Sequence, residues 1–498
     1  MKRIDFPRGG PCRPALFSLL AFLTACAVGP DYERPAVDLP ATFTAAPGKA
    51  PSWSASETLV LKEWWRLFGD DDLNELVAKA RLHNFDLRAA IARVDEAEAL
   101  AREAGAAYFP RIDLGASSSR SQVSRIGAIP VPAPASRMRD SRQAALGVSY
   151  EIDLWGRIRR MNEAATADFL ATAYAKDTIE LSVSAYVVSA YVALRAADAN
   201  LSFTQSTLES RKQVLEIVRS RVDAGSASTL ELYQAEGVLE AARAQLAGLR
   251  HQRALAESQL ALLTGEAGLA IKPDDLLRLP IPPVPPPGLP SELIESRPDI
   301  RLAEESLIAA NARIGVAKAA LFPSVSLTGA MGSESTALVK LFSAPAEVWS
   351  ISAALAMPIF DAGRNFARID QATARQRQEL ANYLKSVQTA FKEVNDALVG
   401  LRENSEGDRA QAARAVAATK TLELAQRRYE AGYSPFLEVL DAQRGANDAR
   451  LAFIDLRQAR LNSVVDLFKA IGGGWSDPFE KASDVTPGVD GADAEGEK

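Results

Sequence analysis

Residues 187–226 read VVSAYVALRAADANLSFTQSTLESRKQVLEIVRSRVDAGS, and this stretch decides the fold. An apolar residue recurs at every seventh position: Val187, Leu194, Leu201, Leu208, Leu215 and Val222. No proline occurs from Trp155 to Gly225. A seven-residue repeat is typical of coiled coils, so the pattern predicts one helix of about 105 Å at 1.5 Å per residue, supercoiled to the left against its neighbours.

The second half of the chain repeats the first, which predicts a duplicated architecture. The second half has the same seven-residue spacing of apolar residues, which form the seam of the helix, at Val394, Leu401, Leu422 and Tyr429. Asp408 and Ala415 interrupt this seam. Short motifs recur in the same order: Asp86-Leu87 as Asp299-Ile300, Tyr108-Phe109-Pro110 as Leu321-Phe322-Pro323, Trp155-Gly156-Arg157 as Ala362-Gly363-Arg364, and Leu230-Glu231 as Leu437-Glu438. The proline-rich stretch 282–287 between the halves cannot be a helix or a central strand, so it reads as an extended linker.

Two segments in each half alternate between apolar and small or polar residues, as strands do. The apolar positions are Ile112, Leu114 and Ala116, then Leu146, Val148, Tyr150 and Ile152, then Val325, Leu327 and Gly329, then Trp349, Ile351, Ala353, Leu355 and Met357. They predict two hairpins, whose strands are long enough for the roughly 9–11 residues of a tilted transmembrane strand. A half-buried soluble hairpin has the same pattern. Four strands are too few for a membrane barrel, which needs about eight, so spanning would require subunits to pool their strands.

Composition narrows the classes of function. The chain has 498 residues and a net charge of −6, which gives no electrostatic basis for binding nucleic acid. Two histidines, His83 and His251, and two cysteines, Cys12 and Cys26, are too few for a multi-ligand zinc site or a histidine-based triad. Acids and bases lie on predicted helix surfaces without a clustered nucleophile. We therefore expect no enzyme activity, no cofactor and no bound metal.

The N-terminus has the pattern of an export signal. An apolar run over 15–25, too short to stay in a bilayer as a helix, follows Lys2, Arg3, Arg8 and Arg13. The run ends in LTAC at 23–26, which resembles the bacterial lipobox. We expect cleavage before Cys26, lipid on its thiol and, because Ala27 and not aspartate follows, sorting to the outer membrane. A chance cysteine after an ordinary secretory signal is the alternative.

The chain as a whole resembles the TolC-like outer membrane factors, in particular the NodT-type lipoprotein branch that serves resistance-nodulation-division pumps. The resemblance runs from Cys26 to about Gly474. It rests on the duplicated Phe-Pro turns and on CAVGPDY (26–32), Trp64-Trp65, RYEAG (428–432) and LEVLDAQR (437–444). It implies a mainly α fold with a small membrane β part, in which three subunits form a twelve-stranded barrel continued by a periplasmic helical barrel.

The resemblance also implies function and partners. The chain would be a passive conduit that exports small molecules such as drugs across the periplasm and outer membrane. Its partners would be two further copies of itself, outer membrane lipid, a periplasmic adaptor and an inner membrane resistance-nodulation-division pump. Two other functions stay open: an outer membrane duct for type I protein secretion, and a lipid-anchored periplasmic coiled-coil scaffold.

Two sets of residues acquire roles through the resemblance. The turns Ala224-Gly225-Ser226 and Ala431-Gly432-Tyr433 would reverse the long helices at the periplasmic tip and meet the adaptor. A resting gate would be lined by Leu437, Asp441 and Arg444, whose spacing places them on one side of a helix. The first half has Leu230, Gln234 and Gly237 at the equivalent positions, so the predicted gate is asymmetric.

The starts of the returning helices carry capping signals. Ser228 with Glu231 predicts a capping box, and Ser434-Pro435 predicts an N-cap followed by proline at the first helical position. Along the whole chain we predict a signal peptide at 1–25, a lipid-anchored segment at 26–70, a first repeat at 71–279, a proline-rich linker at 280–290, a second repeat at 291–474 and a disordered acidic tail at 475–498.

Overall fold

The computed structural model describes residues 27–37, 40, 43, 62–126, 134–283, 297–475 and 478–479. The predicted signal peptide and Cys26, with most of the predicted linker and tail, lie outside the described residues. The chain divides into two compact units. One comprises Met1–Pro35, Asp95–Ala171 and Ala303–Tyr383, and the other Ala36–Val94, Thr172–Leu302 and Leu384–Lys498. Each unit therefore takes segments from both halves of the sequence.

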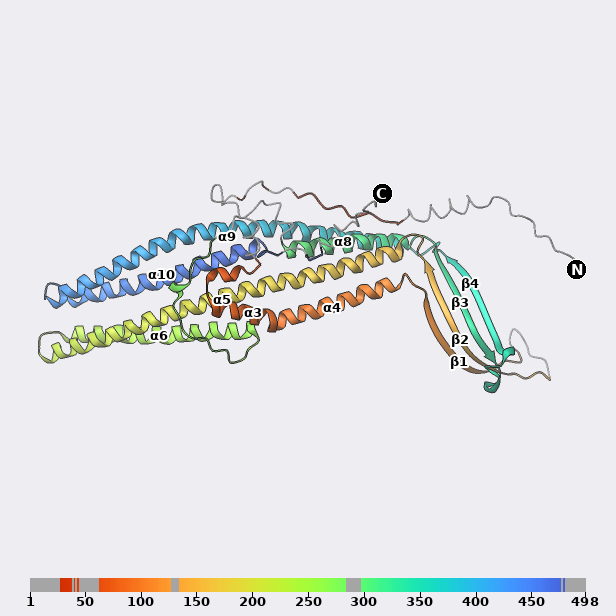
Figure 1. Ribbon diagram of the computed structural model, residues 1–498, viewed down its shortest axis with the longest axis horizontal. Helices are drawn as coiled ribbons and strands as arrows, with labels where there is room; N and C mark the ends of the chain where they lie inside the picture. Colours follow the sequence, from red (N-terminus) through yellow and green to blue (C-terminus); the bar gives the residue numbers. More distant parts are fainter. Residues whose placement is uncertain are drawn as a thin grey trace, which may run out of the picture. The chain divides into compact units, whose positions relative to one another are not determined.

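The first unit contains one antiparallel sheet of four strands in the order β1-β2-β3-β4 (Figure 1). The strands are β1 (Arg111–Gln122), β2 (Met138–Ile152), β3 (Ser324–Ser335) and β4 (Glu347–Ala356). Each half of the chain supplies one hairpin, as the alternation predicts, and the β2–β3 pairing joins the two hairpins. The β2–β3 pairing begins just after the Phe322-Pro323 turn, where Ile152 pairs with Val325.

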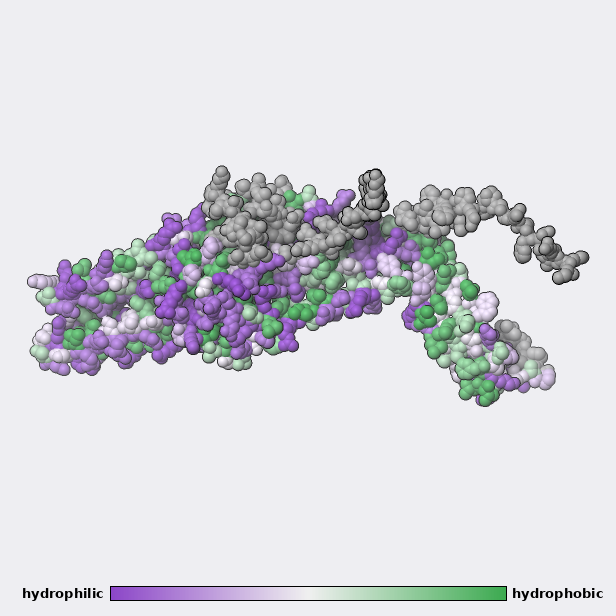
Figure 2. Space-filling view, in the orientation of Figure 1, coloured by the Kyte–Doolittle hydropathy of each residue, from purple (hydrophilic) through white to green (hydrophobic). Residues whose placement is uncertain are grey.

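Apart from Val348, the large apolar residues of all four strands lie on one face of this sheet. Directly paired residues share a face, and the pairing runs from Ile112 to Val148, from Leu146 to Met331 and from Met331 to Trp349. The side chains on this face are exposed, with 67% of Ile112 and 73% of Trp349 accessible. Figure 2 shows these strands covered largely by hydrophobic and pale residues. An apolar face this large without a cover is typical of an interaction with lipid or with another chain.

The N-terminal segment 27–35 packs on helices of the same unit. Asn311 on α8 (Pro298–Ala319) donates to the carbonyl of Pro30 at 3.0 Å, and Arg34 pairs with Glu304 at 2.6 Å. Gly29, at φ 126°, passes so close that an added Cβ would lie 2.6 Å from the Cα of Gly315. The GPDY motif after the lipobox thus has a structural explanation in this close approach.

The second unit is helical. It contains η1 (Trp64–Phe68), α3 (Asp71–His83), η2 (Leu276–Arg278), α6 (Thr229–Thr264) and α10 (Phe436–Ala470). The helices α5 (Arg157–Asp223) and α9 (Arg364–Glu430), like α4 (Phe85–Ala106), contribute residues to both units. The two long helices have 67 residues each, which confirms the uninterrupted helix predicted between Trp155 and Gly225.

The predicted seam residues form the core of this unit. Val187 and Leu194 on α5 are fully buried, and they belong to a cluster that includes Trp64, Phe68 and Phe468. The indole of Trp64 stacks on Phe468 with ring centroids 5.2 Å apart. One α5 window is long and apolar enough to cross a membrane, but 56% of it is buried, as in a core helix.

Asp408 and Ala415 interrupt the apolar repeat, yet both residues remain in the buried seam. Both are buried, with 5% and 7% of their surfaces accessible. Asp408 accepts a hydrogen bond from Arg460 at 2.7 Å and lies 3.6 Å from the guanidinium of Arg457. The charge stays in the interior because two arginines of α10 compensate it.

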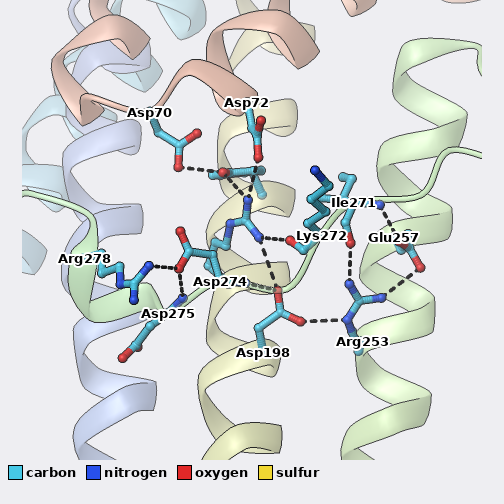
Figure 3. A network of polar contacts seen from close by, with 12 residues as sticks. Asp70, Asp72, Asp198, Arg253, Glu257, Ile271, Lys272, Asp274, Asp275 and Arg278 are labelled. Atoms are coloured by element: carbon cyan, nitrogen blue, oxygen red, sulfur yellow. Dashed lines mark hydrogen bonds and ion pairs between the residues drawn. The ribbon is translucent and has the colours of Figure 1, made fainter.

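A second polar network fixes α3 against α5 and α6 (Figure 3). Arg195 on α5 is 2% exposed and donates to the carbonyl of Lys272 at 2.6 Å and to the hydroxyl of Tyr191 at 2.6 Å. Asp198 accepts from Arg253 of α6 at 2.7 Å. Burial raises the pKa of Tyr191, so its hydroxyl stays protonated and donates to Asp70. Both arginines pair with the buried Asp198.

Candidate functional site

Two tight turns close the helical hairpins of the second unit. Gly225 follows α5 at φ 70°, and Gly432 follows α9 at φ 78°. In the first turn the amide of Ser226 donates to the carbonyl of Arg221 at 2.8 Å, and in the second Tyr433 donates to Arg428 at 2.8 Å. This is the glycine-terminated helix end expected from the repeated motif. The residues at the centre of the two turns are exposed: Ala224, Gly225, Ser226, Ala431, Gly432 and Tyr433.

The two turns belong to one packed tip. Leu215 and Val218 of α5 share a core cluster with Phe436 and Leu440 of α10. Tyr429 packs against Phe436 with tilted rings whose centroids are 5.3 Å apart, and its hydroxyl donates to Glu231 of α6 at 3.2 Å. Burial raises the pKa of Tyr429. Contacts between the two hairpins therefore hold the turns side by side, as Figure 1 also shows.

The capping predictions are partly right. Ser228 is the N-cap of α6, and its hydroxyl accepts from the amide of Glu231 at 3.3 Å. The carboxylate of Glu231 accepts from Tyr429. In the second turn the prediction of Ser434 as N-cap is wrong. Pro435, with extended backbone, is the N-cap of α10, and the hydroxyl of Ser434 has no hydrogen-bond partner.

The predicted gate residues lie on the first turns of α10. Leu437, Asp441 and Arg444 are all exposed. Within the described part of the chain, neither Asp441 nor Arg444 has an oppositely charged group within 4.0 Å. Leu437 and Arg444 border a cavity of about 380 Å³. Gln234 and Gly237 of α6, the equivalent positions of the first half, line the same cavity, so the structure brings the two sets together.

Sequence reasoning missed Arg211, which lines this cavity from α5. Arg211 is 7% exposed and donates to the carbonyl of Val238 at 2.8 Å. A signal for it exists, because Arg211 stands between Leu208 and Leu215 where a heptad repeat has its second seam position. That second seam is buried along α5 at Ala197, Thr204 and Val218.

Comparison with known proteins agrees with the duplicated chain. The family description "Outer membrane efflux protein" matches residues 76–266 and 289–473, one segment in each half. The cation efflux system protein CusC of Escherichia coli K12 is 34% identical over 470 residues, covering 93% of this chain and all of CusC. The outer membrane protein OprJ of Pseudomonas aeruginosa is 36% identical over 466 residues, covering 92% of this chain and 96% of OprJ.

The fold agrees with a solved channel. The outer membrane channel CmeC of Campylobacter jejuni superposes with a TM-score of 0.83 at 27% identity, covering 92% of this chain and 97% of CmeC. The predicted mainly α fold with a small sheet, the efflux function and the outer membrane location are confirmed. With both halves matched by one family and nearly the full length shared with named efflux proteins, the chain belongs to the outer membrane efflux proteins.

Proposed function

We propose that three copies of this chain form a passive conduit that exports small molecules through the outer membrane as part of a tripartite pump. The sheet is the observation that carries the proposal. Its four strands have one exposed apolar face, and its outer strands β1 and β4 each pair on one side only. Open strand edges leave backbone groups unpaired in hydrocarbon, so the sheet needs further strands to span it. Three copies supply twelve strands, an ordinary number for a membrane barrel.

The partners follow from this placement. With the sheet in outer membrane lipid, the helical unit faces the periplasm, and the exposed turns at Gly225 and Gly432 contact a periplasmic adaptor. An inner membrane resistance-nodulation-division pump supplies energy and selects cargo. The proposal assigns no catalytic step to this chain. Among its described residues, no three His, Cys, Asp or Glu side chains gather as metal ligands would.

The gate belongs to the same proposal. Leu437, Asp441 and Arg444 are exposed in a single chain, which leaves their side chains available to the equivalent residues of two neighbours around a threefold axis. Asp441 of one subunit then pairs with Arg444 of another, because three like charges near an axis repel one another. The equivalent residues of the first half, Gln234 and Gly237, carry no charge. Charged and neutral positions therefore alternate around the ring that the three subunits form.

Reconstitution tests the conduit. The purified protein should run as heat-resistant trimers and produce discrete single-channel currents in planar lipid bilayers. A lipid-anchored scaffold would give neither trimers nor currents. A duct for protein secretion would conduct but would restore export of a polypeptide, and not drug resistance, to a strain that lacks its own outer membrane channel.

Lipid attachment at Cys26 is tested separately. Cys26→Ser should abolish acyl labelling, yet leave trimers in the outer membrane, because the barrel inserts independently of a single lipid anchor. Mass spectrometry that finds an unmodified Cys26 thiol in the mature protein would remove the lipoprotein assignment and leave the channel intact.

A further inference from the structure

Among the described residues, each buried arginine except one has an acidic partner. The described residues include four buried arginines: Arg160, Arg195, Arg211 and Arg297. Arg160 pairs with Asp31 and Glu163, Arg195 with Asp72 and Asp198, and Arg297 with Asp299 and Glu393. Arg211 has no carboxylate within 4.0 Å among the described residues. A buried guanidinium without an anion is costly, so its surroundings need explanation.

The hydrogen bonds of Arg211 leave part of its guanidinium unused. One Nη donates to the carbonyl of Val238 on α6, and the buried Nε has no partner. Burial, then the nearby Arg444, lowers the pKa of Arg211, while Asp448 raises it. An arginine in a protein nevertheless stays charged, because its ordinary pKa is above 12. The guanidinium thus stays positively charged, with no acidic partner within ion-pair distance among the described residues.

Arg211 also lines a second cavity, of about 400 Å³, between α5, α9 and α10. Arg450 of α10 is the other charged residue of its lining, which contains no aspartate or glutamate. Arg450 lies over the ring of Phe453 at 5.6 Å and, like Arg211, has no described acid within ion-pair distance. The polar lining also includes the amides of Gln426, Gln443 and Asn447 and the hydroxyls of Ser206, Thr207, Ser210 and Thr419.

We propose that this cavity binds a small oxyanion, a carboxylate or phosphate, between Arg211 of α5 and Arg450 of α10. Guanidinium groups bind the oxygens of such anions through paired hydrogen bonds, and the surrounding amides offer further donors. Asp448 borders the neighbouring cavity and is absent from this lining, so no carboxylate of the lining competes with the anion for the two arginines. The bound anion joins the two helical hairpins above their turns.

Phosphate binding to the intact protein tests the site. Full-length protein in detergent is dialysed exhaustively into chloride and titrated with inorganic phosphate at constant ionic strength in a calorimeter. The wild type should bind saturably. Arg450→Gln should weaken binding about tenfold or more, since it removes charge-assisted hydrogen bonds and leaves the bond from Arg211 to Val238 intact. Arg211→Gln should have an equal or larger effect.

The control is Arg409→Gln, which removes an exposed arginine of α9 that does not line the cavity. It should bind phosphate as the wild type does. Absence of saturable binding in the wild type overturns the proposal, because the site would then be filled by another chain or by none. Equal weakening by Arg409→Gln and Arg450→Gln also overturns it, because the effect would then follow net charge. Citrate in place of phosphate separates a general oxyanion site from one that accepts phosphate alone. The assay measures binding directly, so it is independent of the proposed export function.

Discussion

The first and second halves of the chain have the same succession of strands and long helices, but they place their buried charges differently. Arg253 and Arg460 occupy equivalent positions in the alignment that pairs Leu230 with Leu437, and each binds the buried acid of its own half. The acids do not align, because the equivalent of Asp198 is Ser405 and the second acid is Asp408. Three residues is nearly one helical turn, so both acids face the returning helix. Both halves therefore have an arginine–aspartate pair between the two helices, but the aspartate lies three residues further along the chain in the second half.

The largest effect should come from breaking the second of these ion pairs. Asp408→Ala leaves the partly buried Arg457 and Arg460 without their buried carboxylate, and should lower the free energy of unfolding by about 3 kcal/mol, the low end for breaking a buried ion pair. Asp396→Ala, which removes an exposed partner of Lys392 on the same helix, should cost less than about 0.5 kcal/mol. Denaturant titration of the detergent-solubilised protein measures both. Equal losses would mean that Asp408 contributes no more than a surface charge.

The two hairpins of the sheet should respond alike to a charge on their apolar face. Val148→Arg on β2 and Ile351→Arg on β4 should each cost about 2–4 kcal/mol in the membrane, because both side chains share the face that the proposal exposes to lipid. Ser149→Arg places the same charge on the opposite face and should be mild. Trimer yield in outer membrane fractions is the measurement. Equal tolerance of Val148→Arg and Ser149→Arg would favour a sheet in water.

How far sequence predicts this structure depends on how local the signal is. The heptads at Leu194 and Leu201, the alternation around Val148 and the glycine at 225 are local patterns, and the structure confirms each. The burial of Asp408 could not be predicted, because its compensating charges lie about fifty residues away on another helix. Arg211 stands at a recognisable seam position, but the cavity that it lines is formed by three helices and cannot be recognised from that position alone. The gate residues were named through a resemblance, and their proposed partners belong to other subunits.

The gate should show a functional difference between the halves. Asp441→Ala and Arg444→Ala each remove one member of the proposed intersubunit pair, worth at most about 1 kcal/mol at an exposed site, which corresponds to roughly fivefold in the closed-to-open ratio. Resting conductance in bilayers and vancomycin uptake by cells should rise, and Leu437→Ala should add to the leak. Gln234→Ala, the matched change in the first half, should do little. Unchanged permeability in the Asp441→Ala/Arg444→Ala double variant, at normal trimer levels, would contradict the assignment of these residues to a gate.

The smallest predicted effect distinguishes the two turns. Ser228 caps α6 through the amide of Glu231, whereas the hydroxyl of Ser434 bonds to nothing before α10. Ser228→Ala removes the side-chain acceptor of that amide, which still donates to the carbonyl of Ser228 at 3.1 Å, and should cost about 0.5 kcal/mol, the low end for a cap. Ser434→Ala removes an unbonded hydroxyl and should be neutral. Hydrogen exchange of the first-turn amides of α6 and α10 measures the difference. Faster exchange should appear at Glu231 alone, and equal exchange in both variants would mean that solvent already replaces the Ser228 cap.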